Sequence, residues 1–462
     1  MLDNNLANEI LTEATSKGAD FAEIFIENKD NSSVSLINGK VDSALSGLDF
    51  GLGLRVFYNG KTIYAYTNDL TRESLLKMAK EVAKATKGNK NLTILDFDKK
   101  DYKNIGIHKA KILPTSISKI KIVDMLKEAS DSAFNYDSLI TETISSYTHS
   151  IQDICIINTK GLFVEDRRVR TRFTINAVAS NETEKQTGSV SPGALMGFEF
   201  YDTINVNELA REASRSAVTM LKADLCPSGK MPVVIDNGFG GVIFHEACGH
   251  GLEAIKIARG DSVFVGKIGE KIASDKVTAI DDGTILNKWG SINIDDEGTE
   301  AQKTVLIENG ILKSYLVDNF YGEKIGMAST GSCRRESYKY APVPRMRNTF
   351  IANGNDKKED IIKNTEKGLY AKYMGGGSVN PATGEFNFSV REAYLIENGK
   401  ITTPVRGATL IGKGEEVLKD IDMVSDTLSH SEGMCGASSG SVPTCVGQPM
   451  LRVSKITVGG RS

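Results

Sequence analysis

The sequence predicts an α+β protein in which repeated N-terminal α-β(n)-α units are followed by a mainly antiparallel β C-terminal domain. Helical and strand periodicities occur in the same order twice in the first half of the chain. The composition then shifts toward glycine and short β-runs. A chain of 50.1 kDa accommodates two or three domains, and we place them at residues 1–112, 113–225 and 226–462.

The first unit begins with an amphipathic helix that ends at Gly18, because glycine is typical just after a helix C-terminus. Strands rich in β-formers follow, and Asn59-Gly60 is a strong hairpin signal. A second helix begins near Thr71, and the lysine-rich segment 87–111 is predicted to be a linker. The strands are expected at residues 21–27, 32–37, 50–58 and 62–67.

The second unit repeats this order of elements. A helix carries apolar residues at helical spacing from Ile120 to Ala129, long strands run from Leu139 to about Phe200, and a closing helix ends near Leu221. The order of periodicities, rather than sequence identity between the halves, predicts the repeat.

The third region begins after Cys226-Pro227. A strand is expected at 232–236 and a glycine turn at 238–241, followed by a helix. The segments 305–310 and 394–399 are similar apolar strands that end in Asn-Gly, which predicts antiparallel hairpins. The glycine-rich segments 375–377 and 433–447 are expected to be long irregular loops, which in globular proteins usually carry binding or catalysis.

The most informative segment is His245-Glu246-Ala247-Cys248-Gly249-His250, which lies on the helix of the third region. Two imidazoles and a carboxylate within six residues are typical of a zinc hydrolase. Histidines five apart point about 140° away from each other on an ideal helix, so we expect a π-bulge or a helix end between them. The predicted C-terminal domain therefore carries a metal-binding helix.

A catalytic zinc normally takes three protein ligands, so a third ligand is expected elsewhere in the chain. Cys435, on a glycine-flanked segment near the C-terminus, is the favoured candidate. His430 and Glu432 have suitable chemistry and remain alternatives, whereas Cys248 is expected to point into the protein. In this arrangement Glu246 is the predicted general base and Zn²⁺ the predicted cofactor.

Other motifs have competing interpretations. Backbone amides of Gly375, Gly376 and Gly377 are a candidate substrate-binding element, but no nucleotide-binding signature follows them. The segment 334–338, with Arg335 and Tyr338, either orients substrate or stabilises an oxyanion, or it forms a surface salt-bridge cluster. The acidic run 295–297 is expected to be a solvated turn rather than a calcium site.

Several of these stretches together resemble the TldD/PmbA family of metallopeptidases, and specifically its TldD branch. The presence of the His-Glu segment separates this chain from the PmbA, or TldE, branch. The residues that carry the resemblance are 245–250, 290–299, 334–338, 344–346, 375–377, 380–386 and 433–436.

The resemblance implies zinc bound by His245, His250 and Cys435. It also implies cleavage of unfolded polypeptides or peptides inside a chamber that the chain forms with a PmbA/TldE-like subunit, a second copy of the chain being the alternative partner. Two other functions remain open: a non-catalytic scaffold or polypeptide-binding subunit with a four-ligand structural zinc, and an amidase acting on a small molecule in a closed pocket.

The composition bounds the remaining partners. A net charge of −3 and a pI near 6.1 give no basic footprint for nucleic acid. No apolar run of about eighteen residues and no signal peptide are visible, so we expect no membrane partner and a cytoplasmic location. The six cysteines are scattered, which favours reduced thiols or a metal ligand over disulfides.

Overall fold

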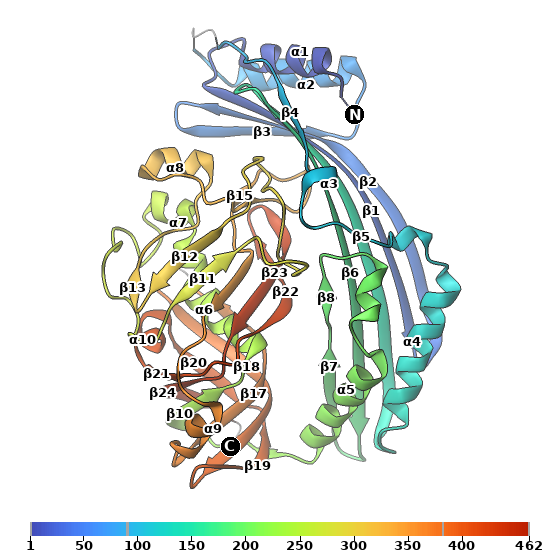
Figure 1. Cartoon of the computed structure of the whole chain (residues 1–462), viewed down its shortest axis with the longest axis vertical. Helices are drawn as coiled ribbons and strands as arrows, with labels where there is room; N and C mark the ends of the chain where they lie inside the picture. Colours follow the sequence, from blue (N-terminus) through green and yellow to red (C-terminus); the bar gives the residue numbers. More distant parts are fainter. Residues whose placement is uncertain (1, 89–91, 381–382, 461–462) are drawn as a thin grey trace.

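The computed structural model describes residues 2–88, 92–380 and 383–460. The N-terminal half forms one long, curved β-sheet with helices packed on it, and the C-terminal half is a second body that lies against the inner face of this sheet (Figure 1). Pro381 and Ala382, which belong to one of the motifs that carry the family resemblance, lie outside the described residues.

The N-terminal sheet is built on β1 (Phe21–Ile37), which pairs antiparallel with β2 (Lys40–Tyr58) on one side and β5 (Ile140–Asn158) on the other. The two strands expected at 21–27 and 32–37 are therefore one strand. The intervening polar residues remain extended because both of their edges are paired. The other strands of this sheet are β3 (Lys61–Thr67), β4 (Asp98–Asp101), β6 (Leu162–Ser180), β7 (Lys185–Val190) and β8 (Gly193–Ala194).

The two expected N-terminal units share this one sheet, because β1 of the first unit pairs with β5 of the second. The segment expected to be a linker contributes structure as well. Within it, β4 pairs parallel with β6 and is followed by the short helix α3 (Tyr102–Ile105). Residues 89–91 of this segment lie outside the described part of the chain.

The amphipathic helices occur in the segments where the spacing of apolar residues predicted them. Helices α1 (Asn4–Thr15) and α2 (Arg72–Lys84) bury their apolar faces in one core, while α4 (Lys119–Phe134) and α5 (Val206–Leu221) bury theirs in a second. Asp3 caps α1 by accepting hydrogen bonds from the backbone N–H groups of Asn5 and Leu6. The N-terminal half also contains the 3₁₀ turns η1 (Pro114–Ser116) and η2 (Phe198–Asp202).

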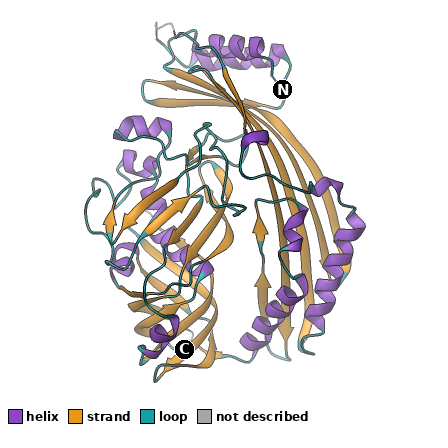
Figure 2. Ribbon diagram, in the orientation of Figure 1, coloured by secondary structure: helices purple, strands orange, loops and turns teal. Residues whose placement is uncertain are grey.

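The C-terminal body contains two larger sheets and is mainly antiparallel, with short helices between its strands (Figure 2). In the first sheet β17 (Lys367–Val379) pairs with both β10 (Gly229–Ile235) and β18 (Glu385–Glu397), and these pairings close part of the sheet into a small barrel. This sheet comprises β9 (Asp224–Leu225), β10 (Gly229–Ile235), β17 (Lys367–Val379), β18 (Glu385–Glu397), β19 (Lys400–Arg406), β20 (Thr409–Lys413), β21 (Ile421–Val424) and β24 (Leu451–Gly459).

The second sheet ends at the strand that carries Cys435. Its strands are β13 (Ile311–Leu312), β12 (Lys303–Glu308), β11 (Ala279–Asp282), β16 (Asn348–Ile351), β23 (Gly440–Gln448) and β22 (Ser429–Ala437), in spatial order. The remaining elements are β14 (Cys333–Arg334), β15 (Val343–Pro344), α6 (Val242–Ala247), α7 (Ala254–Arg259), α8 (Asn319–Ile325), α9 (Lys358–Lys363), α10 (Gly414–Lys419), η3 (Gly238–Gly241) and η4 (Gly249–Leu252).

Both segments expected to be irregular loops are strands. Residues 375–377 belong to β17, and most of the segment 433–447 forms the hairpin β22–β23. The register of β17 shifts three times between Ala371 and Gly377, so the glycines occupy a bulged strand, in which Gly375 and Gly377 leave no room for a Cβ and Gly376 has open space beside it. The Asn-Gly hairpins expected after 305 and 394 are present, with Asn309 and Asn398 at positive φ.

No helix among the described residues has the length and apolar character needed to cross a membrane.

Candidate metal centre

A glycine turn directs the His-Glu segment toward the centre of the C-terminal body. After β10, η3 leads directly into α6, which carries His245 and Glu246. A Cβ on Gly241 would lie 2.4 Å from the carbonyl oxygen of Gly447 in β23. Only glycine therefore allows α6 to begin this close to β23.

The helix ends between the two histidines. Ala247 is the last residue of α6, Cys248 has φ −129° and ψ −48°, and His250 lies in η4. This break brings the imidazole rings of His245 and His250 together, with centroids 5.1 Å apart and nearly perpendicular planes. The sequence predicted either a π-bulge or a helix end between the two histidines, and the structure contains the helix end.

Cys435 joins the two histidines. Its Sγ lies 3.2 Å from Nε2 of His245 and 3.3 Å from Nε2 of His250. The ligand atoms of these three residues lie within 4.8 Å of one another, which is close enough for one ion to contact all three. His245 and Cys435 are buried, with 3% and 5% of their surface exposed.

The charges of this trio stabilise one another. Burial alone would raise the pKa of the Cys435 thiol, but the two imidazoles outweigh it and lower that pKa to about 3. Burial likewise acts to lower the pKa of His250, and Glu253 and Cys435 more than reverse it. Cys435 is therefore a thiolate at neutral pH, the form in which cysteine binds metals.

Two neighbouring residues hold the trio in place. Oε1 of Glu253 lies 3.1 Å from Nδ1 of His250, which leaves Nε2 of that ring directed at Cys435. The guanidinium of Arg345 donates hydrogen bonds to the carbonyl oxygen of Cys435 and to Oγ of Ser439. The sequence prediction missed both residues. The position of Glu253, one helical turn after His250, is the signal that would have indicated its role.

Profiles described as PmbA/TldA metallopeptidase domain 1, central domain and C-terminal domain match residues 22–86, 112–221 and 228–460. The chain is 37% identical to the metalloprotease TldD homolog of Buchnera aphidicola, over 97% of this chain and 95% of that protein. This chain belongs to the PmbA/TldD metallopeptidase family.

Other family members extend the comparison. The metalloprotease TldD homolog of Haemophilus influenzae is also 37% identical, over 96% of this chain and 94% of that protein. The solved structure of TldE from Thermococcus kodakarensis has the same fold, with a TM-score of 0.76 and 18% identity over 98% of this chain and all of that one. A Thermotoga maritima structure described as a candidate modulator of a DNA gyrase has a TM-score of 0.81 and 22% identity, over 98% of this chain and 99% of that one.

The other candidate ligands lie outside the trio. His430 is on β22, but its ring packs against Phe350 with centroids 4.9 Å apart. Glu432 and His430 are absent from the groups of described residues that are close enough to share an ion, and so is Cys248, which is fully buried. None of these three residues is therefore placed to serve as a fourth metal ligand beside the trio in this PmbA/TldD family member.

Glu246 lies beside the trio and is partly open to solvent. Its Oε2 is 3.7 Å from Nε2 of His250, and 25% of its side chain is exposed. A carboxylate at this position could accept a proton from a water molecule next to an ion held by the trio. Two imidazoles, which bind metals in their neutral form, and one thiolate beside a carboxylate form a donor set that zinc accepts.

Two cavities separate the N-terminal sheet from the β22–β23 hairpin, with volumes of about 630 Å³ and 560 Å³. Met434 lines both of them. Neighbouring side chains on a strand point to opposite faces, so Met434 is exposed to the cavities while Cys435 points to the metal side. Gly375 and Gly376 line the smaller of these two cavities.

Arg335 and Tyr338 join the two halves of the molecule. Arg335 donates to the carboxylate of Glu23 at 3.0 Å, and its side chain is fully buried. The backbone N–H of Tyr338 donates to Glu27, and its ring lies where a Cβ on Gly51 would be. These polar groups already have protein partners, although Arg335 also lines the larger cavity.

The acidic run 295–297 is buried, and the expectation of a solvated turn is wrong. The three residues are at most 3% exposed, and two of them pair with arginines of the N-terminal sheet. Arg168 contacts Asp296 and Arg55 contacts Glu297, each at 2.7 Å. Sequence inspection could not detect this because the balancing charges lie more than a hundred residues away.

Proposed function

We propose that the chain is a zinc-dependent metallopeptidase that hydrolyses peptide bonds of unfolded polypeptides or peptides. The convergence of His245, His250 and Cys435 beside Glu246 is the observation that carries this proposal. A relative at 26% identity, from Saccharolobus solfataricus, is named a zinc metalloprotease TldD homolog, which supports zinc as the metal. A His₂Cys donor set is also one that zinc accepts in catalytic sites.

Each residue has a separate role in the proposed reaction. His245, His250 and Cys435 hold the metal, and Glu253 orients the ring of His250. When bound, zinc supplies Lewis-acid chemistry that polarises a carbonyl group and makes water more acidic. Glu246 accepts the proton of the attacking water and delivers it to the leaving amine.

The substrate is proposed to be an extended peptide because β22 forms an edge of its sheet among the described residues. A peptide can extend such an edge through backbone hydrogen bonds, which places little demand on its sequence. Gly375 and Gly376 would line the same path without side chains to obstruct it. Arg335 and Tyr338 would act by holding the N-terminal sheet as the opposite wall.

We further propose that the chain works with a PmbA/TldE-like subunit, with a second copy of itself as the alternative. The shared fold with TldE from Thermococcus kodakarensis supports a partner of related shape. Such a partner would close the open side of the cavities and limit the substrate to unfolded chains. An amidase for small molecules would instead require a closed pocket at the metal within one chain.

The proposal is tested by replacing Glu246 with glutamine. We expect the zinc-loaded variant to retain one zinc per chain and to cleave a fluorescence-quenched disordered peptide about 10²- to 10⁴-fold more slowly, because the general base is lost. Both proteins are assayed alone and mixed with a PmbA-like subunit. Undiminished cleavage by the zinc-loaded variant would refute the role of Glu246.

The same assay separates the rival functions. His245→Ala should lose both zinc and cleavage. If the parent chain binds zinc but cleaves no peptide with or without a partner, the metal is structural and the scaffold function is supported instead.

A further inference from the structure

The strand β6 carries arginines at every second position: Arg168, Arg170 and Arg172. Alternate residues of a strand share one face, so all three belong to the face that looks toward the C-terminal body. Period-two spacing of arginine on a long strand was visible in the sequence, but its meaning depends on what covers that face. The larger cavity of about 630 Å³ lies there, and we call it the cationic cavity.

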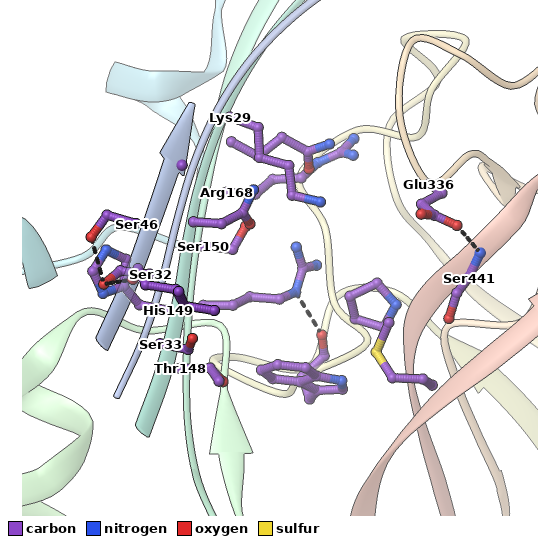
Figure 3. A pocket seen from close by; sticks show the side chains of 18 of the residues that line it. Lys29, Ser32, Ser33, Ser46, Thr148, His149, Ser150, Arg168, Glu336 and Ser441 are labelled. Carbon is purple, nitrogen blue, oxygen red and sulfur yellow. Dashed lines mark hydrogen bonds between the residues drawn. The ribbon is translucent and has the colours of Figure 1, made fainter. Parts of the chain in front are cut away.

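Cross-strand pairing gathers more polar groups on this face. Arg170 lies opposite Ser150 of β5, and Arg168 lies opposite Gln152, which in turn lies opposite Lys29 of β1. Figure 3 shows Lys29, Ser150 and Arg168 on the sheet side of the cavity. Glu336 and Ser441 lie across from them.

The three arginines differ in how their charge is balanced. Arg168 contacts Asp296 at 2.7 Å and Asp166 at 3.5 Å. Arg170 is only 6% exposed, yet it donates only to the carbonyl oxygens of Trp289 and Ser291 and contacts no carboxylate in the described part of the chain. Arg170 is therefore a buried cation without an ion-pair partner.

Arg334 repeats this situation on the opposite wall. It is 4% exposed and donates one hydrogen bond, from Nη1 to the carbonyl oxygen of Met346 at 2.8 Å. Within the described residues it also forms no ion pair. Two guanidinium groups without an ion-pair contact among the described residues, from different halves of the molecule, thus line one cavity.

Lys29 adds a third cation, whose half-buried ammonium group makes no ion-pair contact or hydrogen bond among the described residues, although its charge acts on the nearby carboxylate of Glu27. Glu336 is the carboxylate among the lining side chains, and its Oε2 accepts a hydrogen bond from the backbone N–H of Ser441 at 2.6 Å. Five lining side chains are cationic, namely Lys29, Arg168, Arg170, Arg334 and Arg335, so positive charge exceeds negative charge on the described lining of the cavity.

Isolated buried charges are costly, and proteins normally pair them. The cost is visible in the pKa of Arg334, which burial and the neighbouring Arg168 and Arg345 lower to about 9. Burial and the charge of Arg334 likewise lower the pKa of Arg170. An anion entering the cavity would relieve both effects, and a planar carboxylate matches the fork of a guanidinium.

We propose that the cationic cavity is a subsite for a carboxylate group of the peptide substrate, held by Arg170, Arg334 and Lys29. This inference rests on the proposed peptidase function. Met434, Ser441 and Pro443 form the hairpin wall of the cavity, and Cys435 lies on the other face of the same hairpin. The subsite therefore holds a part of the substrate that lies away from the scissile bond, and it selects for acidic side chains or for a free C-terminus.

Binding is measured by fluorescence anisotropy with the full chain carrying Glu246→Gln, so that cleavage does not interfere. The probes are four dye-labelled ten-residue peptides of one sequence, with either Glu or Gln at a central position and either a free carboxylate or an amide at the C-terminus. We expect one carboxylate to tighten binding about tenfold or more, as is typical of charge-assisted hydrogen bonds. The Glu–Gln pair and the carboxylate–amide pair show which source the subsite uses.

Variants of the cavity-lining residues then show which side chains cause the preference for a carboxylate. Lys29→Gln should reduce the preference for carboxylate severalfold, Lys29→Arg should keep it, and Arg334→Gln should nearly abolish it. Lys222→Gln, an exposed lysine outside the cavity, is the matched control and should change nothing. If Arg334→Gln does not fold, the half-buried Lys29 variants decide the question.

Equal binding of all four peptides would overturn the inference, as would a preference that survives in both Lys29→Gln and Arg334→Gln. The outcome is independent of catalysis. If the chain prefers carboxylate peptides but never cleaves any peptide, the proposed peptidase function is refuted and the subsite is supported. If the chain cleaves peptides but shows no such preference, the subsite is refuted and the peptidase function is supported.

Discussion

Cys435 depends on its surroundings for its chemical state. In water a thiol is mostly protonated at neutral pH, whereas here two imidazoles within 3.3 Å stabilise the thiolate against the cost of burial. His245 and His250 come from one segment, but Cys435 is separated from His245 by 190 residues. The metal centre therefore exists only in the folded chain, and zinc binding should stabilise the fold.

At the same scale, Glu253 should control zinc affinity without contacting zinc. Glu253→Gln removes the charge that holds Nδ1 of His250, so we expect zinc to bind about 10- to 100-fold more weakly. Competition with a chelating dye measures the dissociation constant.

Glu308→Gln, at an exposed carboxylate that pairs with Lys313, serves as the control and should leave zinc affinity unchanged. Unaltered affinity in Glu253→Gln would mean that the packing of η4, rather than the carboxylate, orients His250.

At the scale of elements, the close packing of α6 on β23 determines where the metal-binding segment points. The sequence anticipated a strand, a glycine turn and a helix, and β10, η3 and α6 follow that order. It did not anticipate that the segments 375–377 and 433–447 are strands. Glycine-rich stretches are ambiguous because pairing with neighbouring strands, here β18 and β16, decides whether they become ordered strands.

Gly241→Ala should therefore disturb both stability and the metal centre. The added methyl group would lie 2.4 Å from the carbonyl oxygen of Gly447, so α6 must move away from β23. We expect a loss of about 1–3 kcal/mol in the free energy of unfolding, together with weaker zinc binding. Urea denaturation and a zinc titration measure the two effects.

Gly436→Ala is the matched control because it adds the same methyl group next to Cys435 where no atom lies within 4 Å. It should leave both quantities unchanged. Comparable losses in the two variants would show that flexibility at glycine, rather than the close approach to β23, matters.

At the scale of the whole molecule, buried ion clusters join the two halves on either side of the cavities. Glu392 of β18 accepts hydrogen bonds from Arg215 and Ser216 of α5 at 2.7 Å and 2.8 Å, and it is fully buried. Burial would raise the pKa of Glu392, but Arg215, Tyr394 and Ser216 outweigh it and lower that pKa to about 2. The position of the N-terminal sheet over the hairpin depends partly on this cluster.

Glu392→Gln should lower the free energy of unfolding at pH 7 by about 2–3 kcal/mol, because hydrogen bonds to a charged group are lost. The pKa is lower in the folded state than in the unfolded chain, so this contribution is complete above about pH 4.5 and is lost as the pH falls toward about 2. The difference between parent and variant should therefore shrink when urea denaturation is repeated between pH 5 and pH 3.

Glu385→Gln, at an exposed residue of the same strand, provides the comparison and should have little effect at any pH. A difference for Glu392→Gln that stays constant down to pH 3 would indicate that the charge of Glu392 does not stabilise the junction.

The sequence by itself determined the features that depend on neighbours along the chain. Apolar spacing located α1, α2, α4 and α5, Asn-Gly pairs located the hairpins, and the segment 245–250 located the two histidines with the carboxylate between them. Local backbone preferences and side-chain periodicity act over a few residues, so they can be read from the sequence directly.

Only the tertiary structure decided the features that depend on distant partners. It merged the two N-terminal units into one sheet, buried the acidic run 295–297 beside Arg55 and Arg168, and left Arg170 and Arg334 without ion-pair contacts among the described residues in one cavity. Strand pairing and burial set whether a charge is solvated, paired or isolated, and both arise from contacts between residues that are far apart in sequence.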